Sequence, residues 1–175
     1  FYLGNYPETL KDFLRSVDMF DSLGDKSGQA DVYNELGVFY SQQEDYETCL
    51  KYYKKAEELG KSNNLTKALA ISLSNQGQLH FKLGEYDKCY PYMSEALAIK
   101  RSRSDSVGMG YELKRLASYY FIKKQHKSSV KYLDESSAIR RKIKDKHGLA
   151  VNEVTLAEMY QERGLINEAI NGYHN

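Results

Sequence analysis

The chain has 175 residues, a formal net charge of +1 and only two prolines. Leu, Lys, Glu, Ala and Tyr are abundant, and this composition favours a soluble protein that is helical nearly throughout. The sequence contains no apolar run approaching the roughly 20 residues of a membrane-spanning helix and no visible signal peptide, which excludes both kinds of segment from the residues given.

Apolar periodicity predicts helices along the whole chain, arranged in antiparallel pairs. The sequence opens in the last turns of one helix and continues into a second helix over 7–23, where Pro7 takes an N-terminal position at which a missing N–H costs little. A last helix is cut off at Asn175, so we expect the chain to be a fragment of a longer protein. The helices between them are expected at 28–43, 45–59, 66–83, 85–101, 106–123, 125–143 and 147–163.

The sequence repeats its own pattern every 40 residues. Self-similarity at a fixed period of about 20 to 50 residues is typical of a solenoid, in which each unit packs on its neighbours. We therefore expect an all-α solenoid of antiparallel helix pairs that forms one array over 1–175. Its parts are a partial repeat 1–24, repeats 25–64, 65–104 and 105–144, and a partial repeat 145–175.

Acidic residues recur just before the first helix of a pair. Asp25, Asp105 and Asp145 share this register, where a carboxylate can accept a hydrogen bond from the unpaired backbone N–H groups of a helix start. Leu65 breaks the pattern, and Asn64 beside it is expected to act as the cap instead.

Glycine recurs where the first helix of a pair turns into the second, at Gly4, Gly84 and Gly164. Left-handed backbone geometry at such a turn suits glycine. Glu44 and Lys124 occupy the same slot, so we expect their turns to close differently or with some strain.

Small residues recur where two helices should approach closely, and bulky residues fill the space between them at close-packed density. Most of the 16 tyrosines follow the same period and are interpreted as packing residues. The small residues are Gly37, Gly77, Ala117, Ala157, Cys49, Cys89, Ser129 and Ala169, and the bulky ones are Leu36, Tyr40, Tyr53, Met93, Leu116, Tyr120, Leu133 and Leu156.

This spacing resembles the tetratricopeptide repeat, whose pattern is carried here by Leu36-Gly37, Tyr40, Cys49, Tyr53 and Ala56. The period of 40 exceeds the usual unit of about 34 residues. It resembles the variety found in kinesin light chains, bacterial peptide-pheromone receptors and the sensor arms of bacterial histidine kinases and transcription regulators. The resemblance covers nearly the whole chain and implies a right-handed superhelix whose first helices line a concave groove.

The resemblance also implies that a protein or peptide binds in this concave groove. Polar residues with a few aromatics face it in this register, which suits an extended peptide or a partner helix. Solvated helix surface, or packing on the next repeat, is the alternative explanation for each residue. A carboxylate clamp for an EEVD-type tail is not expected. The expected ligand contacts are Asn34, Ser41, Ser74, Gln78, Phe81, Tyr111, Lys114, Ser118 and Glu158.

Charge is spread unevenly along the chain. Residues 97–147 carry 14 Lys and Arg against 5 Asp and Glu, whereas the remainder carries 11 against 19. The basic runs fall at the C-terminal ends of second helices, where the helix dipole favours cations, and this explanation is favoured over a nucleic-acid site. A second interpretation is an acidic partner, or the acidic end of another copy, at Arg101, Arg103, Arg140 and Arg141.

The sequence lacks the patterns of catalytic and metal sites. Cys49 and Cys89 fall in small-residue slots one repeat apart, so we expect both to be buried and too far apart for a disulfide. Unpaired thiols favour a reducing, cytoplasmic location. The four histidines have no metal-ligand spacing, and no Gly-rich phosphate loop or hydrolase motif occurs. We therefore predict no enzyme activity, no cofactor and no metal.

Three functions remain open at this stage. The first is a non-catalytic protein- or peptide-binding module, the regulatory or sensor part of a larger bacterial signalling or transcription-regulating protein. The second is a self-associating scaffold, because neither end of the array has a polar capping helix. The third is a tether for an enzyme domain outside this sequence.

Overall fold

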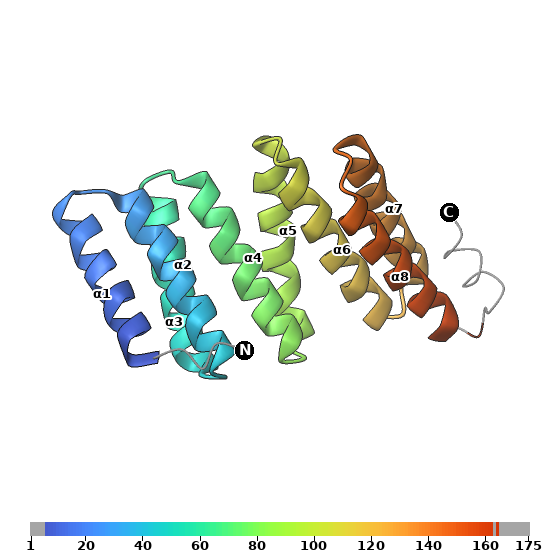
Figure 1. Ribbon diagram of the computed structural model, residues 1–175. Coiled ribbons are helices and arrows are strands. Elements are labelled where there is room, and N and C mark those ends of the chain that lie inside the picture. Colours follow the sequence, from blue (N-terminus) through green and yellow to red (C-terminus); the bar gives the residue numbers. More distant parts are fainter. Residues whose placement is uncertain (1–5, 163, 165–175) are drawn as a thin grey trace. The chain divides into compact units, whose positions relative to one another are not determined.

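The protein is all-α in the part of the chain that the structure, a computed structural model, describes, namely residues 6–162 and 164 (Figure 1). The helices form successive antiparallel pairs, as the sequence predicted. They are α1 Tyr6–Ser22, α2 Lys26–Gln42, α3 Tyr46–Ser62, α4 Thr66–Lys82, α5 Tyr86–Ser102, α6 Ser106–Ile122, α7 His126–Lys142 and α8 Lys146–Glu162.

Helix and turn lengths explain the sequence period. Each helix has 17 residues, and successive helices begin 20 positions apart, so that two helices and their turns fill one 40-residue repeat. The predicted bounds lie within three residues of these. The helix ends expected before Tyr6 and after residue 164 fall outside the described residues.

The chain divides into two compact units, residues 1–96 and 97–175, and the division falls within α5. In unit 1, α2 packs against α1, α3 and α4. In unit 2, α7 packs against α6 and α8, and α6 also touches α8. Within each unit, first helices are therefore neighbours of first helices, α2 of α4 and α6 of α8 (Figure 1). The single array over 1–175 stays a prediction.

Aspartate side chains cap the helix starts where the sequence predicted them. Asp25, Asp105 and Asp145 each accept a hydrogen bond at 2.8–2.9 Å from the backbone N–H three residues later. A fourth cap, which was not predicted, is made by Asp45, which accepts from the Thr48 N–H at 3.1 Å at the start of α3. A cap of this kind stabilises a helix by about 1 kcal/mol.

The expected cap by Asn64 is wrong. Leu65 takes the N-cap position of α4 and makes no side-chain cap bond. Asn64 has a φ of +55° and forms the turn that precedes α4. Asparagine tolerates this left-handed geometry better than most residues, so its role is to close the turn.

The turns from first to second helix all use one left-handed residue. Gly84 and Gly164 have φ of +74° and +70°, as predicted, whereas Gly4 lies outside the described residues. Glu44 and Lys124 adopt the same geometry, with φ of +62° and +57°. These turns therefore close in the same way, and the two side chains carry the steric cost that glycine avoids.

Gly37 and Gly77, two of the predicted small residues, lie where helices approach closely, while Ala169 falls outside the described residues. A Cβ added to Gly37 would overlap the ring of Tyr53, and one added to Gly77 would lie 2.9 Å from Cγ of Met93. Cys49 and Cys89 are fully buried free thiols, as expected. Burial raises the pKa of Cys49, which makes it a poor nucleophile.

One slot in the second helix of each pair is filled differently along the chain. The residues that occupy it, 40 apart, are Phe20, Gly60, Lys100 and Arg140. Phe20 packs on the next helix, and Gly60 lets that helix come close. Lys100 is buried and pairs with the fully buried carboxylate of Glu112 at 2.7 Å. Arg140 is also buried, at 1% exposure.

Candidate binding surface

The first-helix face of unit 2 exposes an apolar patch on α6 and α8, two helices that touch each other. We define this face by Val107, Tyr111, Lys114 and Ser118 of α6 and by Val151, Val154 and Glu158 of α8. Its four large apolar side chains are all exposed, Tyr111 at 50% and Val154 at 44%. A cluster of exposed apolar residues with polar neighbours is typical of an interaction site.

Tyr111 is held rigidly on this face from beneath. The guanidinium carbon of Arg140 lies 4.6 Å from the centroid of the Tyr111 ring, within the range of a cation–π interaction. Arg140 is itself fixed, because its Nη1 pairs with Asp145 at 2.5 Å and its Nε donates to Ser136 at 3.3 Å. A ring held in this way loses little conformational entropy when a partner packs on it.

Two glycines create the room for this buried guanidinium. A Cβ on Gly110 of α6 would lie 3.1 Å from Nε of Arg140, and a Cβ on Gly148 of α8 would overlap its Nη1. Ser136 completes the joint, since it donates to the Gly110 carbonyl at 2.7 Å and accepts from Asn152 at 2.9 Å. Arg140 therefore ties α6, α7 and α8 together.

The expectation that Arg140 binds an acidic partner is corrected by this arrangement. Its charge is buried and already paired with Asp145, so it cannot serve as a surface cation. Arg101, which is half-exposed, pairs with Glu135 at 2.5 Å. Arg103 and Arg141 lie at the surface, and their role toward an acidic partner stays a prediction.

Acidification is expected to destabilise unit 2 through Asp145. The Gly148 N–H that donates to it, and the Arg140 guanidinium, hold the pKa of Asp145 below its ordinary value of 3.8. A lowered pKa adds stability that is complete above the ordinary pKa and is lost as the pH falls through the folded value. The melting temperature should therefore drop below about pH 4. In Asp145→Asn the melting temperature should fall less at low pH. Asp105→Asn removes a helix cap that is not paired with a buried arginine, so that variant should keep the fall.

The first-helix face of unit 1 is more closed than the sequence suggested. Asn34 is buried and donates to the Ala68 carbonyl at 3.4 Å, and Ser74 is buried as well. Ser41 and Phe81 are half-buried, and Gln78 is exposed. The role of these five residues as ligand contacts stays a prediction, and we leave the two buried ones out of the proposed surface.

Helix α4 departs from the repeat at two core positions. Gln76 replaces a leucine, is fully buried and donates to Glu57 at 2.6 Å. His80 replaces a tyrosine, stacks on Tyr92 with ring centroids 5.5 Å apart, and bonds to Glu85 at 2.6 Å. The flat imidazole keeps the stacking that the equivalent tyrosine pairs make, Tyr40 with Tyr52 and Tyr120 with Tyr132.

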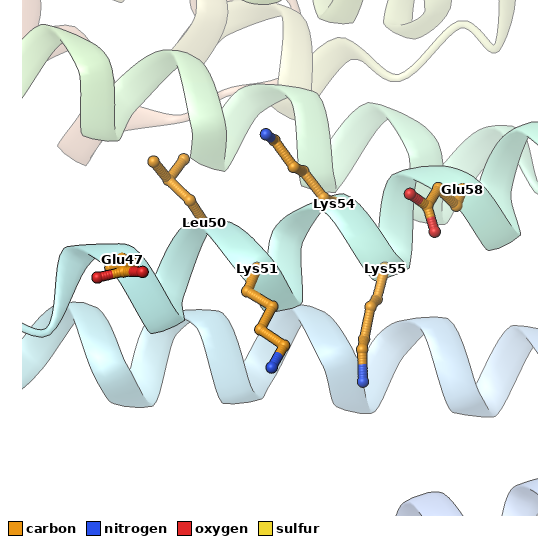
Figure 2. A pocket seen from close by; sticks show the side chains of 6 residues that line it. All are labelled: Glu47, Leu50, Lys51, Lys54, Lys55 and Glu58. Atoms are coloured by element: carbon orange, nitrogen blue, oxygen red, sulfur yellow. The ribbon is translucent and has the colours of Figure 1, made fainter.

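The surface of α3 carries a hollow of about 520 Å³ whose lining comes entirely from that helix (Figure 2). Its lysines and glutamates lie on a solvated helix face. Figure 2 shows Lys51 and Lys55 pointing to one side of α3, and Leu50 and Lys54 to the other. Nothing in this open, mixed-charge lining resembles a catalytic arrangement.

The described residues contain no group of three or more His, Cys, Asp or Glu side chains placed to hold a metal ion. No helix within the same residues is long and apolar enough to cross a membrane.

Val107 of the unit 2 face, and the support that buried Arg140 gives to Tyr111, were not predicted from the sequence. Val107 lies one helical turn before Tyr111, and this i, i+4 spacing could have placed it on the same face. No sequence spacing indicates that Arg140 supports Tyr111, because the two residues lie 29 positions apart on different helices.

Two segments of the chain match a known family of repeat proteins. Residues 30–63 and 70–103 match the tetratricopeptide repeat family. No curated protein sequence matches the chain. The chain resembles BtubC from P. vanneervenii with a TM-score of 0.86 at 15% identity, over 97% of this chain and 70% of that one.

Two further solved structures share the fold. Aspartyl phosphate phosphatase F from Bacillus subtilis matches with a TM-score of 0.66 at 12% identity, over 98% of this chain and 59% of the phosphatase. A kinesin light chain from Podosopora anserina with nearly identical repeats matches with a TM-score of 0.67 at 13% identity, over 98% of this chain and 94% of that one. At such identities the likeness concerns the fold alone.

Proposed function

Since this chain carries tetratricopeptide repeats, we propose that it is a non-catalytic module that binds a protein or peptide on the first-helix face of unit 2. The observation that carries the proposal is the apolar patch on α6 and α8, in which the side chains of Tyr111 and Val154 are both exposed. Packing within unit 2 does not require these side chains, because they lie outside its buried core.

The chemistry of the face fits a partner segment with an apolar anchor. Burying exposed apolar surface contributes about 25 cal/mol per Å², and a rigid aromatic residue at the centre of an interface is a typical hot spot. Tyr111 supplies that residue, Val151 and Val154 extend the apolar area, and Lys114 and Glu158 supply polar groups around it. An extended peptide or a helix laid along α6 and α8 would use all five.

The wider role that we propose is a regulatory or sensor part of a larger bacterial signalling protein. It rests on the fold shared with BtubC and with aspartyl phosphate phosphatase F; the chain spans 59% of the phosphatase. Binding through a repeat face is the physical property on which such a role would depend.

The test uses a library of random dodecapeptides displayed on phage and selected against the immobilised chain. Enriched peptides are synthesised with a fluorescent label and titrated with purified protein by anisotropy. Tyr111→Ala and Val154→Asp should each weaken binding by at least about tenfold, or about 1.4 kcal/mol. Leu14→Ala is the matched control, because Leu14 is 44% exposed like Val154 but lies on α1 of unit 1.

The proposal fails if no peptide is enriched, or if enriched peptides bind both variants of unit 2 as tightly as the parent. Self-association is the alternative function that a specific feature favours, because Leu14 and Met19 of α1 are exposed. Light scattering over a concentration series separates the two, since a binding module stays monomeric and a self-associating scaffold does not.

A further inference from the structure

A hollow of about 420 Å³ lies in unit 1 where the end of α1, the start of α2 and the end of α3 meet. Its lining includes Asp21, Gln29, Tyr33, Lys55 and Glu58. This volume falls at the lower end of the range of ligand pockets, which is about 300–1,000 Å³. Both hollows are open to solvent and share Lys55 and Glu58, but side chains from three helices line this one, whereas the other is lined by α3 alone.

The residue of the lining that departs from all other repeats is Gln29. Gln29 occupies a slot that holds Leu69, Met109 and Leu149 in the other repeats. The other slots vary along the chain: Tyr33 aligns with Leu73, Leu113 and Glu153, Lys55 with Arg15, Glu95 and Glu135, and Glu58 with Asp18, Ala98 and Ala138. Packing therefore does not require the amide of Gln29, since the same fold is built in the other three repeats with an apolar residue in that slot.

Gln29 is costly for a packing residue. Only 7% of the residue is exposed, and its two hydrogen bonds lie at or just beyond the long end of the usual range, 3.2 Å from Lys26 and 3.3 Å to Asp21. A buried amide with weak partners is destabilising compared with leucine. Its presence suggests that the amide has a further partner when the hollow is filled.

A comparison with unit 2 indicates the charge of that partner. At the equivalent joint of α5, α6 and α7, Arg101 and Glu135 form an ion pair at 2.5 Å that bridges two second helices. The equivalent residues here, Asp21 and Lys55, have their charges exchanged. Asp21 turns to Lys26 at 2.7 Å, and Lys55 lies 5.1 Å above the centre of the Tyr33 ring. The bridge that closes the joint in unit 2 is thus open among the described contacts of unit 1.

We propose that this hollow binds a zwitterionic small molecule of the α-amino-acid class, with an apolar side chain, that takes the place of the missing bridge. The carboxylate of the ligand meets Lys55 of α3, and its ammonium group meets Asp21 of α1, so the ligand links the two helices equivalent to those that the ion pair links in unit 2. Its apolar side chain packs on the Tyr33 ring, while Gln29 satisfies a remaining polar group. Charged hydrogen bonds of this kind are stronger than neutral ones, so both ends of the zwitterion contribute.

The experiment titrates the chain with L-phenylalanine and L-leucine by isothermal calorimetry, and repeats the titration with N-acetyl-phenylalanine and phenylalanine amide. The free amino acids should bind saturably. Each derivative lacks one charge and should bind at least about tenfold more weakly, which corresponds to about 1.4 kcal/mol. Absence of saturable binding up to the solubility of both amino acids would overturn the proposal, and so would equal binding of the derivatives.

Three variants locate the site. Gln29→Leu restores the residue of the other repeats, so it should keep or raise the melting temperature and yet weaken binding at least about tenfold. Lys55→Ala should weaken binding similarly. Lys54→Ala is the matched control, because Lys54 is adjacent to Lys55 in α3 and points to the other side of the helix (Figure 2). Equal loss in Lys54→Ala, or none in the first two variants, would place the ligand elsewhere. None of these changes touches the first-helix face of unit 2, so peptide binding there should persist.

Discussion

Lys100→Met is expected to lower the free energy of unfolding by about 3–5 kcal/mol, because it leaves a buried carboxylate without its cation. Glu112 is fully buried, and its Oε2 lies 2.7 Å from the Lys100 ammonium group. Arg115 is 3.6 Å from the same oxygen and can compensate only in part. Chemical denaturation followed by circular dichroism measures the loss.

The same joint should tolerate the removal of both charges. Replacing a buried ion pair by apolar residues of similar size is often neutral or stabilising. The double variant Lys100→Met with Glu112→Leu should therefore have a free energy of unfolding that is higher than that of the parent or lower by no more than about 1 kcal/mol. Arg101→Met is the control, since it breaks an exposed ion pair worth about 0–1 kcal/mol. If the single Lys100→Met variant were as stable as Arg101→Met, Lys100 would not be needed to compensate the buried charge of Glu112.

Gly77→Leu is expected to destabilise unit 1 by about 1–3 kcal/mol or more through overpacking. Even a single Cβ at this position would lie 2.9 Å from Met93 Cγ and 3.3 Å from the Met93 backbone nitrogen. The methionine side chain can move, but the backbone of α5 cannot do so without separating from α4. Thermal melting and chemical denaturation both report the change.

The neighbouring residue provides the control for this substitution. Gln78 is exposed on the same helix, so Gln78→Leu adds a similar side chain without a clash and should change stability by no more than about 0.5 kcal/mol. Two variants of equal stability would mean that Gly77 does not lie in the contact between α4 and α5. Loss in both would point to an effect of hydrophobicity on the surface of α4.

The slot shared by Phe20, Gly60, Lys100 and Arg140 connects the stability of the repeats to their surfaces. The residue in this slot can differ from repeat to repeat, because each repeat of a solenoid packs only against its neighbours. In unit 2 the slot holds Arg140, whose fixed cation lies under Tyr111 and makes this exposed aromatic residue rigid. The proposed binding face thus depends on a residue in the buried joint beneath it.

The fold was predictable because its signals are local and repeated. The 40-residue period, the capping aspartates and the turn glycines each follow from a few residues, and they placed every described helix to within three positions. Asn64 shows the limit of the approach, since capping a helix and closing a left-handed turn both favour asparagine. Only the φ of +55° distinguishes the two roles.

The sequence by itself determined the helix pairs, their period and the side of each helix that packs, because these depend on hydrogen bonds and side-chain spacing along one chain segment. It could not determine the fate of individual polar side chains. Asn34 and Arg140 were expected at the surface and are buried. The reason is physical: the burial of a side chain depends on the room that a neighbouring helix leaves beside it. That room is set here by glycines and small residues distant in the sequence, such as Gly110 and Gly148 around Arg140.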